Sequence, residues 1–106
     1  MKVRYLIAIA ASLSVSATAF AADDGAALFK RHGCTACHSV AKKVVGPALK
    51  EVAEKYRGDG EAQAKLEKKV RNGGSGVWGA MPMPPAPKSV SDGDIKTMLT
   101  WVLSLK

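Results

Sequence analysis

Apolar and polar positions in the first half of the chain predict two helices, and the second repeats apolar residues at the three- and four-residue spacing of an amphipathic helix. The first opens at Asp23 or Asp24, both good N-cap residues, and Gly33 stops it. The second starts at Pro47, a residue suited to the first helical position, and ends at Gly58. The apolar positions are Ala26, Ala27, Leu28 and Phe29 in the first stretch and Leu49, Val52, Ala53 and Tyr56 in the second.

The second half holds two further helical patterns. One runs over about residues 61–71, with Asp59 as a candidate cap. Asp59 and Glu61 lie at its start and Lys68, Lys69 and Arg71 at its end, which suits the helix dipole. The other starts at Ser91, which forms a capping-box-like pair with Asp94 three residues later. The apolar positions are Ala62, Leu66 and Val70 in the former and Ile95, Met98, Leu99, Val102 and Leu105 in the latter.

Between these two patterns, residues 72–90 form a long irregular stretch with four glycines and four prolines. Loops of this length inside a compact domain are uncommon and usually functional. No part of the mature chain shows the alternation of apolar and polar residues that predicts a strand convincingly. We therefore expect an all-α fold of about four short helices in a single domain.

The N-terminal segment has the layout of a secretory signal peptide. Two basic residues lie within positions 1–4, eighteen uncharged residues follow from 5 to 22, and Ala19 and Ala21 supply small residues for a cleavage site. We predict that residues 1–21 are removed on export to the periplasm and that residues 22–106 form the mature domain. A retained membrane anchor is the alternative. Because Ala, Ser and Thr dilute the apolar stretch, we expect no stable membrane insertion.

The mature domain is small and needs a stabilising element. Cleavage leaves 106 − 21 = 85 residues, with 16 − 2 = 14 basic and 9 acidic side chains, so the net charge falls from +7 to +5. Domains of this size bury a limited fraction of their surface and usually need disulfides, a metal or a cofactor. A bridge between Cys34 and Cys37, the only two cysteines, would close a very small loop and constrain the unfolded chain little.

The sequence CTACH at 34–38 predicts covalent haem attachment. Two thiols separated by two residues can each form a thioether with one vinyl group of the same haem, and the adjacent histidine can bind the iron. A redox-active disulfide would need a βαβ context, and a zinc site would need about four ligands, whereas His32 is the only other histidine. We therefore predict one haem c, and we expect His32 to face solvent.

The ligand on the other face of the iron distinguishes an electron carrier from a haem enzyme or a ligand sensor. A methionine would close that face and, as a soft donor, would favour ferrous iron. Met81 and Met83 are the candidates, because both lie in a stretch that prolines stiffen, and spacing alone does not choose between them. Met98 belongs to the apolar stripe of the last helix and is interpreted as core. A vacant or displaceable sixth site is the alternative.

The chain resembles the short bacterial class I cytochromes c. The resemblance rests on CTACH at 34–38, GP at 46–47, GVWG at 76–79 and MPMPP at 81–85, and it spans essentially all of residues 23–106. It implies the class I cytochrome c fold around one covalent haem, and a periplasmic single-electron carrier that is not an enzyme. The chain is similar in particular to monohaem carriers that donate electrons to nitrite reductase or terminal oxidases.

The resemblance also implies roles for individual residues. They are Cys34 and Cys37 as thioether anchors, His38 as proximal iron ligand, Met83 as distal ligand, Pro47 as carbonyl partner of the His38 ring, and Trp78 and Lys69 as partners of the haem propionates. Prolines on both sides of Met83 restrict its backbone. Ala86 stands where relatives often have Asn or Gln, so the methionine sulfur would lack that amide donor, and the loop is slightly longer.

The basic residues are spread along the whole chain, and most are expected to form an ordinary solvated surface. A subset around the haem edge would steer acidic redox partners, a rate effect that salt screens. The predicted partners are a cytochrome-reducing respiratory complex as donor and nitrite reductase or a terminal oxidase as acceptor. No motif supports nucleic-acid binding, and we expect a monomer.

Overall fold

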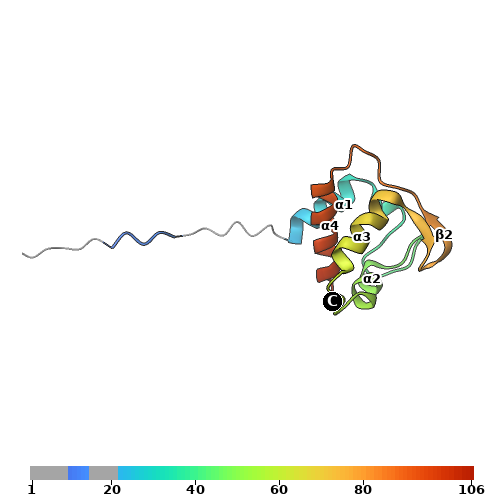
Figure 1. Cartoon of the computed structure of the whole chain (residues 1–106), viewed down its shortest axis with the longest axis horizontal. Helices are drawn as coiled ribbons and strands as arrows, with labels where there is room; N and C mark the ends of the chain where they lie inside the picture. The colour runs from blue at the N-terminus through green and yellow to red at the C-terminus, as the bar shows by residue number, and fades with distance from the viewer. Residues whose placement is uncertain (1–9, 15–21) are drawn as a thin grey trace, which may run out of the picture.

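The apolar stripes of the four predicted helices meet along the last one. In a computed structural model that describes residues 10–14 and 22–106, α4 contacts each of the other three α-helices. The helices are α1 (Ala22–Arg31), the 3-10 helix η1 (Cys34–Ala36), α2 (Leu49–Lys55), α3 (Ala62–Asn72) and α4 (Asp92–Ser104), and the strands are β1 (Gly74–Gly76) and β2 (Gly79–Met83). Figure 1 shows α1 and α4 together on one side of the domain and the hairpin on the opposite side.

The core is one cluster built around α4. The ring of Phe29 from α1 packs against Trp101 of α4 with the ring centroids 5.5 Å apart. Gly25 permits this close crossing, because a Cβ at its position would collide with the Cβ of Trp101. The buried members of the cluster are Phe29, Leu49, Val52, Leu66, Val90, Ile95, Met98, Leu99 and Val102. All four predicted stripes contribute to it, which confirms the helical pattern.

The starts of the first two helices differ from the prediction. Helix α1 already includes Asp23 and Asp24, so neither aspartate is its N-cap. Helix α2 begins two residues after Pro47, because Ala48 keeps an extended backbone with φ −59° and ψ 138°. The first amides of α2 donate to carbonyls of the 39–40 segment at 2.9 and 3.0 Å, so tertiary contacts satisfy this helix end.

The start of α3 differs from the prediction, and the start of α4 agrees with it. The Asp59 carboxylate accepts a hydrogen bond from the Glu61 amide at 2.9 Å and so closes the turn before α3 instead of capping the helix. The cap at Ser91 is confirmed, because its Oγ accepts a hydrogen bond from the Asp94 amide at 3.1 Å.

Strands β1 and β2 form an antiparallel hairpin within the stretch that the sequence predicted to be irregular. Gly74 pairs with Met83 and Gly76 pairs with Gly79, with a register shift between the two pairs. Positive φ angles of 119° at Gly76 and 106° at Gly79 make the tight turn between the strands. The expectation of no strand was wrong, because nearly every residue of both strands is exposed and leaves no alternating pattern to read.

The predicted signal peptide, residues 1–21, lies outside the described residues except for 10–14. Among the helices in the part of the chain that the structure describes, none is long and apolar enough to cross a membrane.

Candidate haem site

A cavity of about 420 Å³ opens between the helices and the hairpin. Its outer wall is made of the hairpin and of residues 43–47. Its inner wall is mainly apolar and comes from the four α-helices, with Phe29 of α1, Leu49 and Val52 of α2, Leu66 and Val70 of α3, and Leu99 and Val102 of α4. Such a cavity suits a large, mainly apolar ligand that a few polar groups orient.

The predicted attachment segment lies directly after α1. Gly33, with φ of 76°, ends that helix, and the amides of Cys37 and His38 both donate to the Cys34 carbonyl at 3.2 and 3.1 Å. Burial against the core raises the pKa of the Cys34 thiol above its ordinary value, and the nearby Cys37 adds a smaller increase. Both cysteines are free, and free thiols are the groups from which thioethers can form.

The His38 ring has one nitrogen committed to a hydrogen bond. Nδ1 lies 2.9 Å from the Pro47 carbonyl oxygen, which can only accept, so Nδ1 carries the proton. In the neutral ring the lone pair is then on Nε2, where a metal can bind. Gly46 lies flat against the ring, because a Cβ there would come within 2.5 Å of Cε1. The amide of Gly46 also donates to the Cys37 carbonyl at 2.8 Å, which closes the segment around the histidine.

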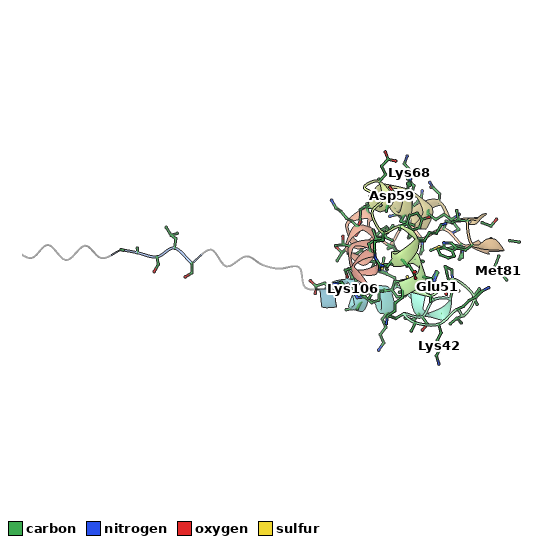
Figure 2. The ribbon with its side chains drawn as sticks, turned by 90° about the horizontal axis from the view of Figure 1, so that it is seen from below. Lys42, Glu51, Asp59, Lys68, Met81 and Lys106 are labelled. Carbon is green, nitrogen blue, oxygen red and sulfur yellow. The ribbon has the colours of Figure 1, made fainter. Side chains whose placement is uncertain are left out.

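Met81 and Met83 both line the cavity but differ in exposure. Met81 is 67% exposed, and Figure 2 shows it at the outer edge of the hairpin, whereas Met83 is half-buried. Gly73 lies close behind Met83, because a Cβ at Gly73 would come within 2.5 Å of the Met83 carbonyl oxygen. Beyond the following prolines, the amide of Ala86 donates to the Val70 carbonyl at 2.9 Å. The end of α3 therefore supports the methionine segment.

Trp78 and Lys69, the predicted propionate partners, also line the cavity. Trp78 lies at the hairpin turn and is 40% exposed, and the ammonium of Lys55 is 5.6 Å from the centroid of its ring, a cation–π distance. Lys69 is half-buried, and a Cβ at Gly74 would lie 3.1 Å from its Nζ. The contact of Lys55 was not predicted, because no local pattern in the sequence links a lysine of α2 to a tryptophan of the hairpin.

The expectation that His32 faces solvent was wrong. Its side chain is only 17% exposed, and its Nε2 lies 2.9 Å from Oδ2 of Asp94. The hydrogen bond from His32 is the main cause that lowers the pKa of Asp94, and Arg31, 3.5 Å from the same oxygen, adds a smaller contribution. The contact arises because the end of α1 packs beside the start of α4.

The side chains around the cavity fit haem better than a metal ion held by protein ligands alone. Haem brings its own ring nitrogens, so the chain needs to supply only anchors and axial ligands. That set consists of two free thiols, a histidine with a committed Nδ1 and a methionine on the opposing hairpin. Of the two cysteines, Cys37 lines the cavity and Cys34 packs against the core. Within residues 10–14 and 22–106, no group of three or more His, Cys, Asp and Glu side chains could hold a metal.

The helices packed around α4 and the cavity with its CTACH segment define a class I cytochrome c. The chain belongs to the cytochrome c family, whose model matches residues 22–106. Over 106 residues, the full length of both proteins, it is 44% identical to cytochrome c-551 of Pseudomonas aeruginosa and 47% identical to cytochrome c-552 of Nitrosomonas europaea.

Solved structures agree with this assignment. The crystal structure of wild-type Nitrosomonas europaea cytochrome c552 matches with a TM-score of 0.73 and 51% identity, covering 76% of this chain and 99% of its own. A class 1 cytochrome from Sideroxydans lithotrophicus matches with a TM-score of 0.66 and 34% identity, covering 78% and 94%. The chain is therefore a haem c protein similar to the small monohaem electron carriers of the c-551 and c-552 type.

Proposed function

We propose that this protein carries single electrons in the periplasm through one haem c with His38 and Met83 as its axial ligands. The observation that carries the proposal is the placement of these two residues on the same cavity. His38 comes from the segment after α1, where its Nδ1–H donates a hydrogen bond to the Pro47 carbonyl, and Met83 comes from the end of β2. The two potential iron ligands thus reach one apolar site from separate parts of the chain.

The remaining predicted site residues would hold the cofactor in place. Cys34 and Cys37 would anchor it through thioethers, and Trp78 and Lys69 would donate hydrogen bonds to its propionates. Haem, when bound, supplies an iron centre that changes by one electron between the ferric and ferrous forms. The role of the polypeptide is then to keep the axial ligands in place in both the ferric and the ferrous form.

Two features of the chain keep the axial ligands in place. The Pro47 carbonyl holds the orientation of the His38 ring and raises the basicity of its other nitrogen. On the other side, Pro82 and Pro84 restrict the backbone of Met83, and Gly73 packs against its carbonyl. Ligands that a rigid shell holds need little rearrangement when the iron changes its charge, which favours a carrier.

The outer edge of the cavity suits partner proteins. Val45, Val77, Trp78 and Met81 all line the cavity and are exposed, and Lys43 and Lys55 lie on the same side of the domain. We infer that a cytochrome-reducing respiratory complex donates electrons there and that nitrite reductase or a terminal oxidase accepts them. In this proposal residues 1–21 direct export and are removed, and residues 22–106 act as a monomer.

Replacement of the two hairpin methionines tests the ligand assignment. In Met83→Ala the weak red absorption band of sulfur bound to ferric iron should vanish, carbon monoxide should bind the reduced protein readily, and the reduction potential should fall, because a soft donor is lost. Met81→Ala is the matched control. It removes the same side chain from an exposed position two residues away and should leave all three properties nearly unchanged.

The reverse behaviour of the two variants would show that the ligand assignment is wrong. A wild-type protein that binds carbon monoxide as fast as Met83→Ala would instead support the alternative function, a haem enzyme or ligand sensor with a displaceable sixth ligand.

A further inference from the structure

The segment that follows Met83 has few hydrogen-bond donors of its own. Pro84, Pro85 and Pro87 carry no backbone N–H, so three of the first four residues after Met83 cannot donate a backbone bond. Two backbone bonds hold the segment, from Ala86 to the Val70 carbonyl and from Val90 to the Pro87 carbonyl, each 2.9 Å long. Further hydrogen bonds that tie this segment to the rest of the domain must therefore come from donors elsewhere in the chain.

Arg71 of α3 supplies these donors. Its Nη1 donates to the Pro87 carbonyl at 3.2 Å and its Nη2 to the Val90 carbonyl at 2.6 Å. Nε and Nη2 also donate to Oδ1 of Asp92, at 3.2 and 2.7 Å. One planar guanidinium thus joins the proline-rich segment, the residue before the Ser91 cap and the first turn of α4.

The bonds to the two carbonyls matter more than the ion pair. The Asp92 side chain is 94% exposed, and an ion pair with so exposed a partner contributes little in water. Val90, in contrast, is a buried member of the core, and its carbonyl accepts the shortest of the four bonds. Charge-assisted bonds to a partly buried carbonyl are costly to lose, because the carbonyl is left without a partner.

Arg71 also lies between two other contacts of the same segment. Val70, directly before it, accepts the Ala86 amide, and Gly73, two residues after it, packs against the Met83 carbonyl. The last turn of α3 thus contacts the methionine segment at three successive places, and Arg71 makes the contact farthest from Met83.

We propose that Arg71 is a positioning residue for the distal iron ligand: it holds the 84–90 segment on α3 through the Pro87 and Val90 carbonyls and so keeps Met83 in the cavity. The inference rests on the proposed ligation by Met83. Without the guanidinium, the segment can lift away from α3 while the core around α4 stays folded, and Met83 then leaves the iron more often.

The test uses the haem-loaded protein and four variants. In Arg71→Gln, carbon monoxide should bind the ferrous protein about tenfold faster than in wild type, equivalent to about 1.4 kcal/mol in the opening equilibrium. Hydrogen exchange of the Ala86 amide should accelerate by a similar factor. Arg71→Lys should give a smaller effect, because its ammonium keeps the charge. Some effect should remain, because an ammonium lacks the fork that reaches both carbonyls. Asp92→Asn is the matched control and should stay close to wild type.

Three results would overturn the inference or its basis. If Arg71→Gln binds carbon monoxide and exchanges its Ala86 amide at the wild-type rates, Arg71 has only a general structural role, whether or not the urea midpoint of the variant falls. An effect of Asp92→Asn as large as that of Arg71→Gln would assign the holding role to the ion pair instead of the carbonyls. A wild-type rate in Met83→Ala would refute the proposed ligation itself, whatever Arg71 does. Should Arg71→Gln not fold, Arg71→Lys carries the same comparison against Asp92→Asn.

Discussion

At the scale of single residues, the site depends on glycines as much as on the residues that carry chemistry. Gly46 leaves room for the His38 ring beside the Pro47 carbonyl, and Gly73 leaves room for the Met83 backbone on α3. Each lies at a place where a Cβ would come within 2.5 Å of the functional segment. Close backbone approach of this kind is possible only without a side chain.

Gly46→Ala tests this requirement at the proximal histidine. The new Cβ would meet Cε1 of His38, so the ring must tilt and weaken its bond to Pro47. We expect a loss of about 1–3 kcal/mol in the free energy of unfolding, the usual range for overpacking, measured with urea on the haem-loaded protein. Gly60→Ala is the control, because nothing lies within 4 Å of a Cβ there. Equal urea midpoints for the two variants would contradict the argument.

At the scale of elements, the pairing of α1 with α4 organises the domain. The Gly25 crossing and the ring contact between Phe29 and Trp101 join α1 to the later turns of α4, and the pair of His32 and Asp94 joins the end of α1 to the start of α4. These contacts are formed between residues more than sixty positions apart in the sequence. The domain is thus closed by its first and last helices, and the cavity lies between the helices and the hairpin.

Gly25→Ala should separate the two helices. Its Cβ would overlap Trp101, so we expect a loss of about 1–3 kcal/mol in the free energy of unfolding. Gly93→Ala makes the same change in the first turn of α4, where the nearest atom to the new Cβ is 3.9 Å away. That control should be neutral or stabilising by about 0.5–1 kcal/mol, because Ala favours a helix over Gly. Thermal unfolding of both haem-loaded variants measures the difference, and a Gly25→Ala protein as stable as Gly93→Ala would refute the close crossing.

The pair of His32 and Asp94 should make stability depend on pH in acid. The pKa of Asp94 is lowered in the folded protein, chiefly by the His32 hydrogen bond, so the unfolded chain binds a proton there more readily. The stabilisation by Asp94 is therefore complete above the ordinary aspartate pKa of about 3.9 and is lost as the pH falls through the lowered value.

Asp94→Asn should remove this component of the acid profile. Urea unfolding at neutral pH and at steps below about pH 4 should show wild type and variant converging as the pH falls. His32→Ala should cause the same convergence, and the double variant should add nothing further. A constant difference between wild type and Asp94→Asn over the whole range would show that the pair does not titrate in this way.

At the scale of the whole molecule, the cofactor completes a core that the short helices close only in part. Leu49, Leu66 and Leu99 come from three different helices and line the same cavity, so haem would pack against all three. The edge of the cavity carries exposed apolar residues, and the predicted mature chain as a whole has a net charge of 14 − 9 = +5. Charge then affects how fast partners arrive, and apolar contact affects how well they dock.

The association rate with an acidic redox partner should fall as ionic strength rises. Attraction between the basic surface and such a partner is screened within about 10 Å at 0.1 M salt. Stopped-flow rates over a salt series measure the effect, and a small uncharged reductant serves as the control with little salt dependence. A partner rate that is indifferent to salt would mean that apolar contact alone governs docking.

Much of this protein is determined by local sequence. The CTACH segment keeps two thiols and a histidine together whatever the rest of the chain does, and the spacing of Ile95, Met98 and Leu99 already predicts the buried face of α4. The Ser91 cap likewise involves a neighbour only three residues away. These features were predicted because the groups that cause them lie close together in the chain.

Tertiary structure alone decided the features that join distant segments. The Arg71 bonds to Pro87 and Val90, the ammonium of Lys55 over Trp78, and the burial of His32 beside Asp94 have no local signature. The hairpin of β1 and β2 was not predicted either, because backbone pairing between exposed residues leaves no hydrophobic pattern in the sequence. A periodicity records only which face of a segment is buried, whereas a hydrogen bond or a cation–π contact depends on where a second segment is brought in space.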